Sequence, residues 1–319
     1  MTFSQEVKSE ILKKLHKIKD CCAQSFLVAV IKAIGSLELS FGGGFCFTIE
    51  SDNHDLLLFC QKIAKEKLHV SSEIESTNAN AKGTAVYSCS FASNIGQKLN
   101  FIKKDEDGTM IINEDIASLL PQNECCKKAF MQGLMLACGS VAIPVLETDT
   151  GENKSKSKYH LELRFSDEKF AKAITQNYDF PFRQLSRKGG VVLYLKDSEI
   201  ISDLLVYAEA VSAKMKLENV IIGRSLRNTA NRQSNCISAN IDKSVNASEK
   251  QLENIATIRS CNKFETLAEP LREIAQKREE FPEATLEEIA KMIGVSKSGA
   301  NHRFIKIAEI ATNLKQQKN

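Results

Sequence analysis

The sequence has no tryptophan, only five prolines in 319 residues, and no apolar run near the roughly 20 residues of a membrane-spanning helix. With 15 glycines and so few prolines, collagen-like and linker-dominated chains are excluded. The first residues lack the apolar core of a secretion signal, so none is expected. Because 43% of residues are hydrophobic, a wholly disordered chain is also excluded, and the length suggests two or three domains.

The ten cysteines include no Cys-x-x-Cys pair, so the spacing of a zinc ribbon is missing. Disulfides are the alternative, but a chain this large and apolar does not need them, and we expect reduced cytoplasmic thiols in the core. The five histidines are scattered, and no Ser-His-Asp or Cys-His arrangement is evident. Gly42-Gly43-Gly44 lacks the ending of a phosphate loop and predicts a hairpin turn. We expect no metal, no cofactor, no small-molecule substrate and no membrane association.

One segment occurs twice. The run Cys21–Leu37 recurs as Cys125–Val141, offset by 104 residues without a gap, with identical Cys-Cys, Phe, Ala and Gly-Ser positions. Two copies imply a duplicated unit with approximate two-fold symmetry. Both copies are apolar almost all round, which predicts buried helices over 26–34 and 129–138. Small residues four apart share a face in each, Ala29 with Ala33 and Gly133 with Ala137, so the two helices should pack closely.

Similar elements are expected after each copy. Alternation and turn signals predict strands at 37–41, 45–50, 70–76 and 85–91 around a helix at 53–67 in the first half. In the second half they predict strands at 159–165, 182–186 and 191–195, a helix at 166–176 capped by Ser166, and a helix at 197–213. Residues 148–158 are expected as a mobile hairpin loop. The fold class is α+β, with a duplicated domain over 1–219 whose halves are about 1–104 and 105–219.

Residues 285–306 have the pattern of a helix-turn-helix. Thr285 and Glu288 form a capping box, Gly294 stands where the turn needs a positive φ, and Ser296 can cap the second helix. Three apolar residues of that helix should face inward: Ala300, Phe304 and Ile307. The opposite face presents Ser298, Asn301, His302 and Lys306, with Lys297 and Arg303 flanking it, and these groups are suited to the DNA major groove. Ser296 is a predicted DNA contact as well. A helical hairpin with a polar surface is the alternative.

The helix-turn-helix should belong to an all-α domain over 248–319, which also contains a helix at 270–280 and one at 249–260 capped by Ser248. Residues 220–247 have little apolar periodicity and predict a polar linker. Alternatively, that segment follows DNA phosphates through Arg224, Arg227, Arg232 and Lys243. Residues 220–319 carry 16 basic and 12 acidic side chains, and the end of the chain after Lys297 is the most basic part. This distribution favours a polyanionic partner.

The run Met131–Gly139 resembles the LAGLIDADG helix of homing endonucleases, and Leu27–Gly35 is a weaker copy. In those enzymes the residue before the final glycine is an acid that holds the catalytic metal. Here these positions are Ile34 and Cys138, which cannot supply the carboxylate oxygen that Mg²⁺ needs. The resemblance therefore implies the fold but not the cleavage chemistry.

Three motifs together resemble the bacterial WhiA family: the paired Cys-Cys…Gly-Ser helices, the run Asn231–Lys243, and Ser296–Arg303. The resemblance covers nearly the whole chain. It implies a degenerate homing-endonuclease-like domain joined to a helix-turn-helix, and a DNA-binding regulator linked to sporulation in some bacteria and to cell division and chromosome segregation in others.

Three functions remain open at this point. The first is a non-catalytic, sequence-specific regulator that binds double-stranded DNA in the cytoplasm at the nucleoid, with transcription or cell-division machinery as further partners. The second is a metal-dependent homing-type endonuclease. The third is a protein- or effector-binding scaffold with secondary DNA contact.

The duplicated domain is not expected to be the main DNA reader. Residues 1–219 have a slight acidic excess. The strand at 159–165 should present His160, Glu162 and Arg164 on one face, and the strand at 45–50 should present Cys46, Thr48 and Glu50. Carboxylates on these faces would repel phosphate, unless lysines of the loop at 148–158 compensate. We therefore expect a docking or regulatory platform.

Overall fold

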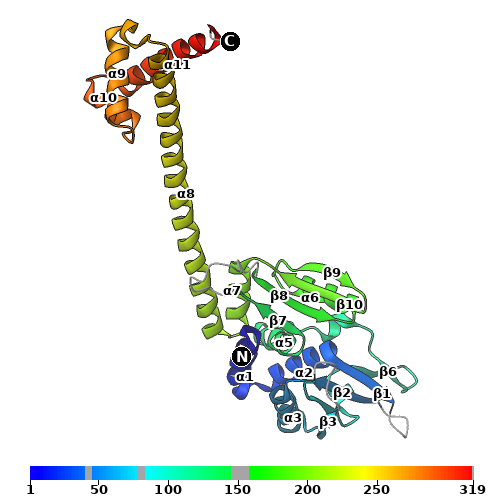
Figure 1. Cartoon of the computed structure of the whole chain (residues 1–319). Coiled ribbons are helices and arrows are strands. Elements are labelled where there is room, and N and C mark those ends of the chain that lie inside the picture. Colours follow the sequence, from blue (N-terminus) through cyan, green and yellow to red (C-terminus); the bar gives the residue numbers. More distant parts are fainter. Residues whose placement is uncertain (40–44, 78–82, 145–157, 318–319) are drawn as a thin grey trace. The chain divides into compact units, whose positions relative to one another are not determined.

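The computed structural model describes residues 1–39, 45–77, 83–144 and 158–317. The chain divides into two compact units, Met1–Arg224 and Ser225–Asn319. Within the described residues, no helix is long and apolar enough to cross a bilayer. The turn expected at Gly42–Gly44 and nearly all of the loop expected at 148–158 lie outside the described residues, drawn in grey in Figure 1.

The first unit is a duplication, as the repeat predicted. Each half begins with a long helix and continues through two strands, a helix and two more strands. The first half contains α2 (Asp20–Ile34), β1 (Gly35–Leu39), β2 (Phe45–Ser51), α3 (His54–Leu68), β3 (Ser72–Thr77) and β4 (Val86–Phe91). The second contains α5 (Glu124–Ala137), β7 (Gly139–Ala142), β8 (His160–Phe165), α6 (Glu168–Asn177), β9 (Arg183–Arg187), β10 (Gly190–Leu195) and α7 (Ser198–Tyr207).

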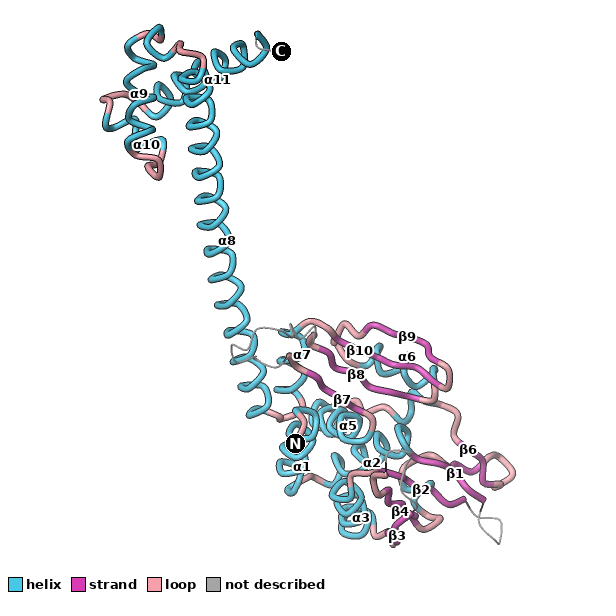
Figure 2. The backbone as a smooth tube through the Cα atoms, viewed as in Figure 1, coloured by secondary structure: helices cyan, strands magenta, loops and turns pink. Residues whose placement is uncertain are grey.

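The two four-stranded sheets have the same topology. Their strand orders are β1-β2-β4-β3 and β7-β8-β10-β9, antiparallel throughout (Figure 2). Elements outside the repeat are α1 (Phe3–Lys14), the 3-10 turns Leu15–Lys17 and Ile116–Leu119, the short helix α4 (Ile95–Lys98), and a hairpin of β5 (Ile102–Lys104) and β6 (Met110–Ile112).

Helices α2 and α5 pack against each other at the centre of the unit, which confirms the prediction from their small residues. A side chain at Gly133 would place its Cβ 2.8 Å from the carbonyl oxygen of Phe26 and 3.0 Å from the Cβ of Ala29. The glycine is therefore what allows the two backbones to approach. Phe26, Ala29 and Phe130 are almost fully buried in this contact region.

The repeated Gly-Ser pair follows from how each central helix ends. Gly35 ends α2 and Gly139 follows α5, and each begins a strand at once. A Cβ at Gly35 would collide with the carbonyl oxygen of Ile31, and one at Gly139 would lie 2.5 Å from that of Met135. Only glycine fits a chain that turns this tightly from helix into strand.

Two predicted helix boundaries in the second half are wrong. Helix α6 is capped by Asp167, not Ser166, because the Asp167 carboxylate accepts hydrogen bonds from the backbone N–H groups of Lys169 and Phe170. The helix predicted at 197–213 is two helices, α7 and then α8 (Val211–Ser260). Glu209 lies between them with a φ of 64°, a left-handed conformation that no helix can continue through.

The segment predicted as a polar linker, residues 220–247, is exposed and polar but helical, and the predicted helix start at Ser248 is wrong. Residues 220–247 are the middle of α8, a single helix of 50 residues. No proline interrupts this stretch, and polar side chains such as Thr229 and Asn246 bond back to carbonyls one turn earlier. Ser248 caps nothing. Its hydroxyl donates to the carbonyl of Pro282 in the second unit.

The second unit is all-helical, as predicted. It contains the end of α8, the 3-10 turn Phe264–Thr266, α9 (Glu269–Glu280), α10 (Leu286–Met292) and α11 (Lys297–Gln317). Its core is separate from that of the first unit and includes Ile258, Ile274, Ile289, Ala300, Phe304 and Ile307.

Candidate nucleic-acid interface

Local signals fix the turn between α10 and α11 as the sequence predicted. Thr285 and Glu288 form a reciprocal capping box at the start of α10. Gly294 has a φ of 68° and ends that helix. The Ser296 hydroxyl accepts a hydrogen bond of 3.1 Å from the backbone N–H of Gly299, which caps α11. The turn at Gly294 and the cap at Ser296 therefore fix the direction in which α11 leaves the turn.

Helix α11 has a buried side and an exposed side. Ala300, Phe304 and Ile307 are at most 4% exposed and anchor the helix in the core. On the exposed side, Ser298, His302 and Lys306 form a row at four-residue spacing, and three further predicted contact residues are also exposed: Ser296, Lys297 and Asn301. A shallow groove runs beside them toward the start of α9, lined by Pro270, Leu271, Ser298, His302 and Lys306 among others. Hydroxyl, amide, imidazole and ammonium groups here can hydrogen-bond to base edges and phosphates.

Arg303 is placed differently from the other predicted contact residues. Its side chain is 23% exposed. The guanidinium donates to the carbonyl oxygen of Pro270 at 3.3 Å and pairs with Glu273 at 3.5 Å. Arg303 therefore holds α11 against α9, which keeps the exposed row in position.

Sequence reasoning missed the side chain that organises this unit. Arg278 of α9 is 2% exposed. Its guanidinium donates to the side-chain oxygen of Gln251 on α8 and to carbonyls of the loop before α10, those of Phe281, Pro282 and Ala284. It also lies 5.5 Å from the centre of the Phe304 ring, and burial lowers its pKa. The sequence carried no signal for this role, since Arg278 stands in a run of charged residues typical of a solvated face.

The four basic residues predicted to follow phosphates lie on α8. Arg224 stacks over the Tyr159 ring at 5.5 Å, whereas Arg227, Arg232 and Lys243 are exposed. At about 100° per residue, Arg232 and Lys243 share one side of the helix and Arg227 lies on another. The structure does not bring the four into a single line.

The two positions predicted to correspond to metal-holding acids lie at the ends of the central helices. Ile34 is the last residue of α2 and packs against the core, and Cys138 is the C-cap of α5. The Cys138 thiol donates to the carbonyl of Leu134 at 3.3 Å, and burial raises its pKa to about 12. A neutral thiol and an alkyl group do not bind a hard divalent cation.

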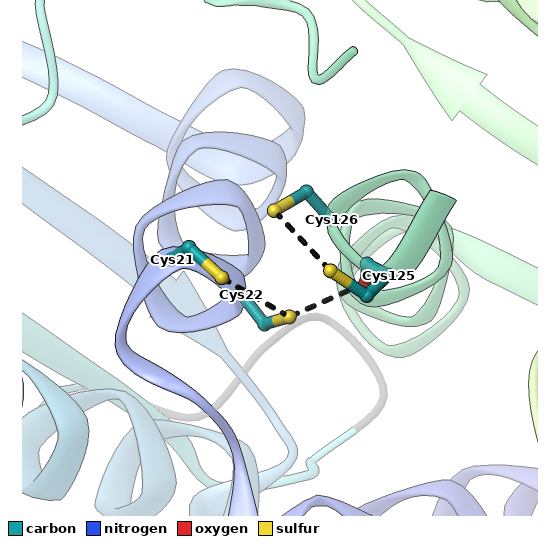
Figure 3. A group of neighbouring side chains, drawn as sticks. All are labelled: Cys21, Cys22, Cys125 and Cys126. Atoms are coloured by element: carbon teal, nitrogen blue, oxygen red, sulfur yellow. Dashed lines mark hydrogen bonds between the residues drawn. The ribbon is translucent and has the colours of Figure 1, made fainter. Parts of the chain in front are cut away.

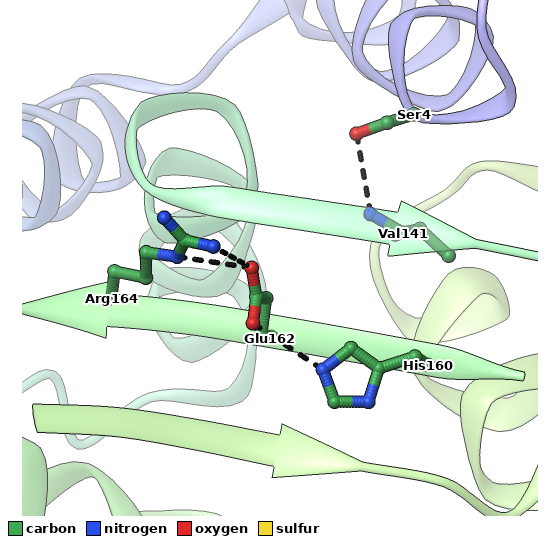
Figure 4. A network of polar contacts seen from close by, with 5 residues as sticks. All are labelled: Ser4, Val141, His160, Glu162 and Arg164. Atoms are coloured by element: carbon green, nitrogen blue, oxygen red, sulfur yellow. Dashed lines mark hydrogen bonds and ion pairs between the residues drawn. The ribbon is translucent and has the colours of Figure 1, made fainter. Parts of the chain in front are cut away.

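On β8, His160, Glu162 and Arg164 share a face as predicted (Figure 4). Glu162 accepts hydrogen bonds from the Arg164 guanidinium at 3.0 Å and pairs with His160 at 3.3 Å. Burial alone would raise the pKa of Glu162, but these partners outweigh it and leave the pKa below its ordinary value. The neighbouring strand β7 is tied to α1, where the hydroxyl of Ser4 accepts from the Val141 N–H at 3.2 Å. The negative charge of Glu162 is thus paired locally.

Fold and site together define a protein with a duplicated LAGLIDADG-like domain followed by a helix-turn-helix domain. Residues 127–227 match the model of the WhiA LAGLIDADG-like domain, and residues 230–311 match the model of the WhiA C-terminal HTH domain.

Known proteins are similar to this chain over nearly its full length. A Bacillus velezensis protein named "Probable cell division protein WhiA" is 34% identical, covering 99% of this chain and 98% of its own. A Clostridium acetobutylicum protein of the same name is 33% identical over 99% of each chain. The crystal structure of full-length DUF199/WhiA from Thermatoga maritima shares the fold, with a TM-score of 0.54 and 21% identity over 98% of this chain and 99% of that one. The chain belongs to the WhiA family.

Proposed function

We propose that this chain is a sequence-specific double-stranded DNA-binding protein whose helix α11 contacts the bases. The observation that carries the proposal is the row of exposed polar and basic side chains at the start of α11. That row is held by the Ser296 cap, by the buried residues of the same helix and by the Arg303 contacts to α9. A helix presented in this way, with its N-terminal residues free, suits insertion into the major groove.

We further propose that the protein is a non-catalytic regulator of bacterial cell division and chromosome segregation, acting at the nucleoid in the cytoplasm. The name of its relatives supports a role in division. Its two units support a division of labour in which the C-terminal unit binds DNA and the N-terminal unit docks transcription or cell-division machinery.

The test of DNA binding is a titration with the full chain. Genome-wide mapping of bound DNA supplies the specific site, which is then compared with random duplex. With a handful of phosphate contacts, affinity should fall by roughly 10³-fold between about 50 and 200 mM salt. Flat affinity over that range contradicts the proposal.

Two substitutions on α11 separate base contacts from phosphate contacts. Asn301→Ala should weaken the specific site by about 1–3 kcal/mol and random DNA much less. Lys306→Ala should weaken both about equally. Lys315→Ala, an exposed lysine at the other end of α11, is the matched control and should change neither. The reverse pattern for Asn301 and Lys306 would show that another face of α11 meets the bases.

The competing endonuclease function makes a different prediction. Because Ile34 and Cys138 replace the acids, the pure protein should not cut plasmid DNA with Mg²⁺ or Mn²⁺. The expected result is intact plasmid in both metals. Double-strand cleavage that EDTA abolishes would overturn the non-catalytic assignment.

A further inference from the structure

Four thiols from the two copies of the repeat meet where the central helices begin (Figure 3). Cys21 and Cys22 belong to the first turn of α2, and Cys125 and Cys126 to the first turn of α5. The four Sγ atoms all lie within 4.8 Å of one another. Within each pair the two Sγ atoms are 3.9 Å apart, and the Cys22 thiol donates to the carbonyl of Cys125 at 3.4 Å. Residues 104 positions apart in the sequence are thus in one cluster.

This spacing fits a single tetrahedral ion. Zinc binds thiolate sulfur at about 2.3 Å, and a regular tetrahedron of that size has sulfurs about 3.8 Å apart. An iron–sulfur cluster distributes its thiolates over several iron atoms and needs them further apart. We propose that Cys21, Cys22, Cys125 and Cys126 bind one Zn²⁺ in an all-thiolate site that joins the two halves of the first unit.

The surroundings of the cluster support an anionic zinc–thiolate centre. Binding of Zn²⁺ to four thiols releases four protons and leaves a net charge of two minus. Four lysines line the same shallow pocket as Cys22 and Cys125: Lys14, Lys17, Lys19 and Lys128. Glu124 and Glu209 line it too, and Glu209 pairs with Lys128 at 2.9 Å, so the pocket keeps an excess of positive charge. Two helix N-termini also point their positive ends at the cluster, and neither α2 nor α5 has a side-chain cap among the described residues. The negative charge of the zinc-bound thiolates would be stabilised by these positive helix ends.

A core-packing role does not account for all four thiols. Cys22 and Cys126 are buried, but Cys21 and Cys125 are exposed. Core residues of that kind are found elsewhere, in Cys60 and Cys89, which are fully buried. A site built from one buried and one exposed cysteine of each half follows the two-fold symmetry of the duplication. The absence of Cys-x-x-Cys spacing does not count against it, because each half supplies adjacent cysteines and the fold supplies the pairing.

The site would fix the helices at a point that the glycine contact does not reach. Gly133 meets Phe26 and Ala29 in the middle of the two helices, whereas the cysteines lie at their first turns. The expected consequence is that metal removal destabilises the first unit and leaves the second, with its separate core, unchanged.

The experiment measures metal in the full chain, purified under reducing conditions without a metal-affinity step. Elemental analysis should give one zinc per chain. Cys125→Ser should lower bound zinc at least tenfold, and Cys21→Ser should do the same. Cys46→Ser is the matched control, since this half-buried thiol of the same unit donates to the carbonyl of Phe91 and serine can keep that bond. It should retain full zinc.

Cobalt gives a second measurement that does not depend on any variant folding. Reduced, metal-free wild-type protein titrated with Co²⁺ should develop the intense visible absorption of a tetrahedral cobalt–thiolate centre, saturating at one equivalent and bleached by Zn²⁺. Protein that contains no zinc and gives no such spectrum overturns the proposal. So does iron as the bound metal, or a disulfide between the two cysteine pairs in protein isolated with thiols blocked at lysis.

Discussion

At the scale of single residues, Gly133 is the position where one added methyl group should matter most. Its Cβ would meet the backbone oxygen of Phe26 at 2.8 Å, and a backbone cannot move aside as a flexible side chain can. Gly133→Ala should therefore lower the free energy of unfolding by about 1–3 kcal/mol, despite the better helix propensity of alanine.

Gly299 provides the matched control for this change. It also lies within a helix, but a Cβ there meets nothing closer than 3.4 Å. Gly299→Ala should leave stability unchanged or raise it by up to about 1 kcal/mol. Urea denaturation of both variants measures the effect. Equal changes at the two sites would show that propensity, not the helix contact, governs Gly133.

Glu162 makes a prediction about pH. Its pKa is lowered because the Arg164 and His160 hydrogen bonds outweigh the effect of burial. The carboxylate therefore contributes stability above its unfolded pKa, and this stability is lost as pH falls through the lower, folded pKa. Glu162→Gln should cost about 1 kcal/mol at neutral pH and progressively less as pH drops below about 4.

The pH dependence is checked by urea midpoints of wild type and variant across this range. Glu114→Gln, at an exposed carboxylate, serves as the control and should track wild type at every pH. A Glu162→Gln effect that is the same at neutral and acidic pH would mean that the ion pair is not its source.

At the scale of elements, the helix-turn-helix could be predicted in detail because its signals are local. The capping box at Thr285, the positive φ of Gly294 and the cap at Ser296 each act over three or four residues, and all three are present. Helix α8 could not, since its middle is exposed and rich in asparagine, and no apolar stripe marked it as helical. The cysteine cluster and the role of Arg278 could not be predicted either, because their partners come from other elements and only the fold brings them together.

Arg278 connects α9 to α8 and to the loop before α10, and its loss should destabilise all three. Arg278→Ala would leave Gln251 and the loop carbonyls without their buried donor. We expect a loss of about 3 kcal/mol in the stability of the second unit. DNA affinity should fall as well, because α10 and α11 depend on that loop.

Lys277→Ala is the neighbouring control. Lys277 pairs with Glu280 at the surface, and its removal should cost less than about 1 kcal/mol. Calorimetry of the full chain, which resolves the transitions of the two units, measures both variants. If Arg278→Ala shifts the transition of the second unit no more than Lys277→Ala, the buried arginine is not the organising group.

At the scale of the whole molecule, the question is which unit reads DNA. The first unit does carry some exposed positive charge, such as Arg183 and Arg187 on the edge strand β9. On the same face of the sheet, Glu162 of β8 adds a carboxylate that is paired with Arg164. The second unit carries the basic excess and presents Lys297 and Lys306 on α11.

A pair of matched charge reversals in the full chain decides between the units. Lys297→Glu with Lys306→Glu should reduce affinity for duplex DNA by about 10²-fold or more, since two phosphate contacts become repulsive. Arg183→Glu with Arg187→Glu makes the same change in net charge on the first unit. It should reduce affinity by no more than about threefold, because salt screens the long-range repulsion between these charges and the DNA. Titrations at one salt concentration compare them. If the β9 reversal weakens binding as much as the α11 reversal, the duplicated domain contacts DNA directly, and its role is not limited to docking other proteins.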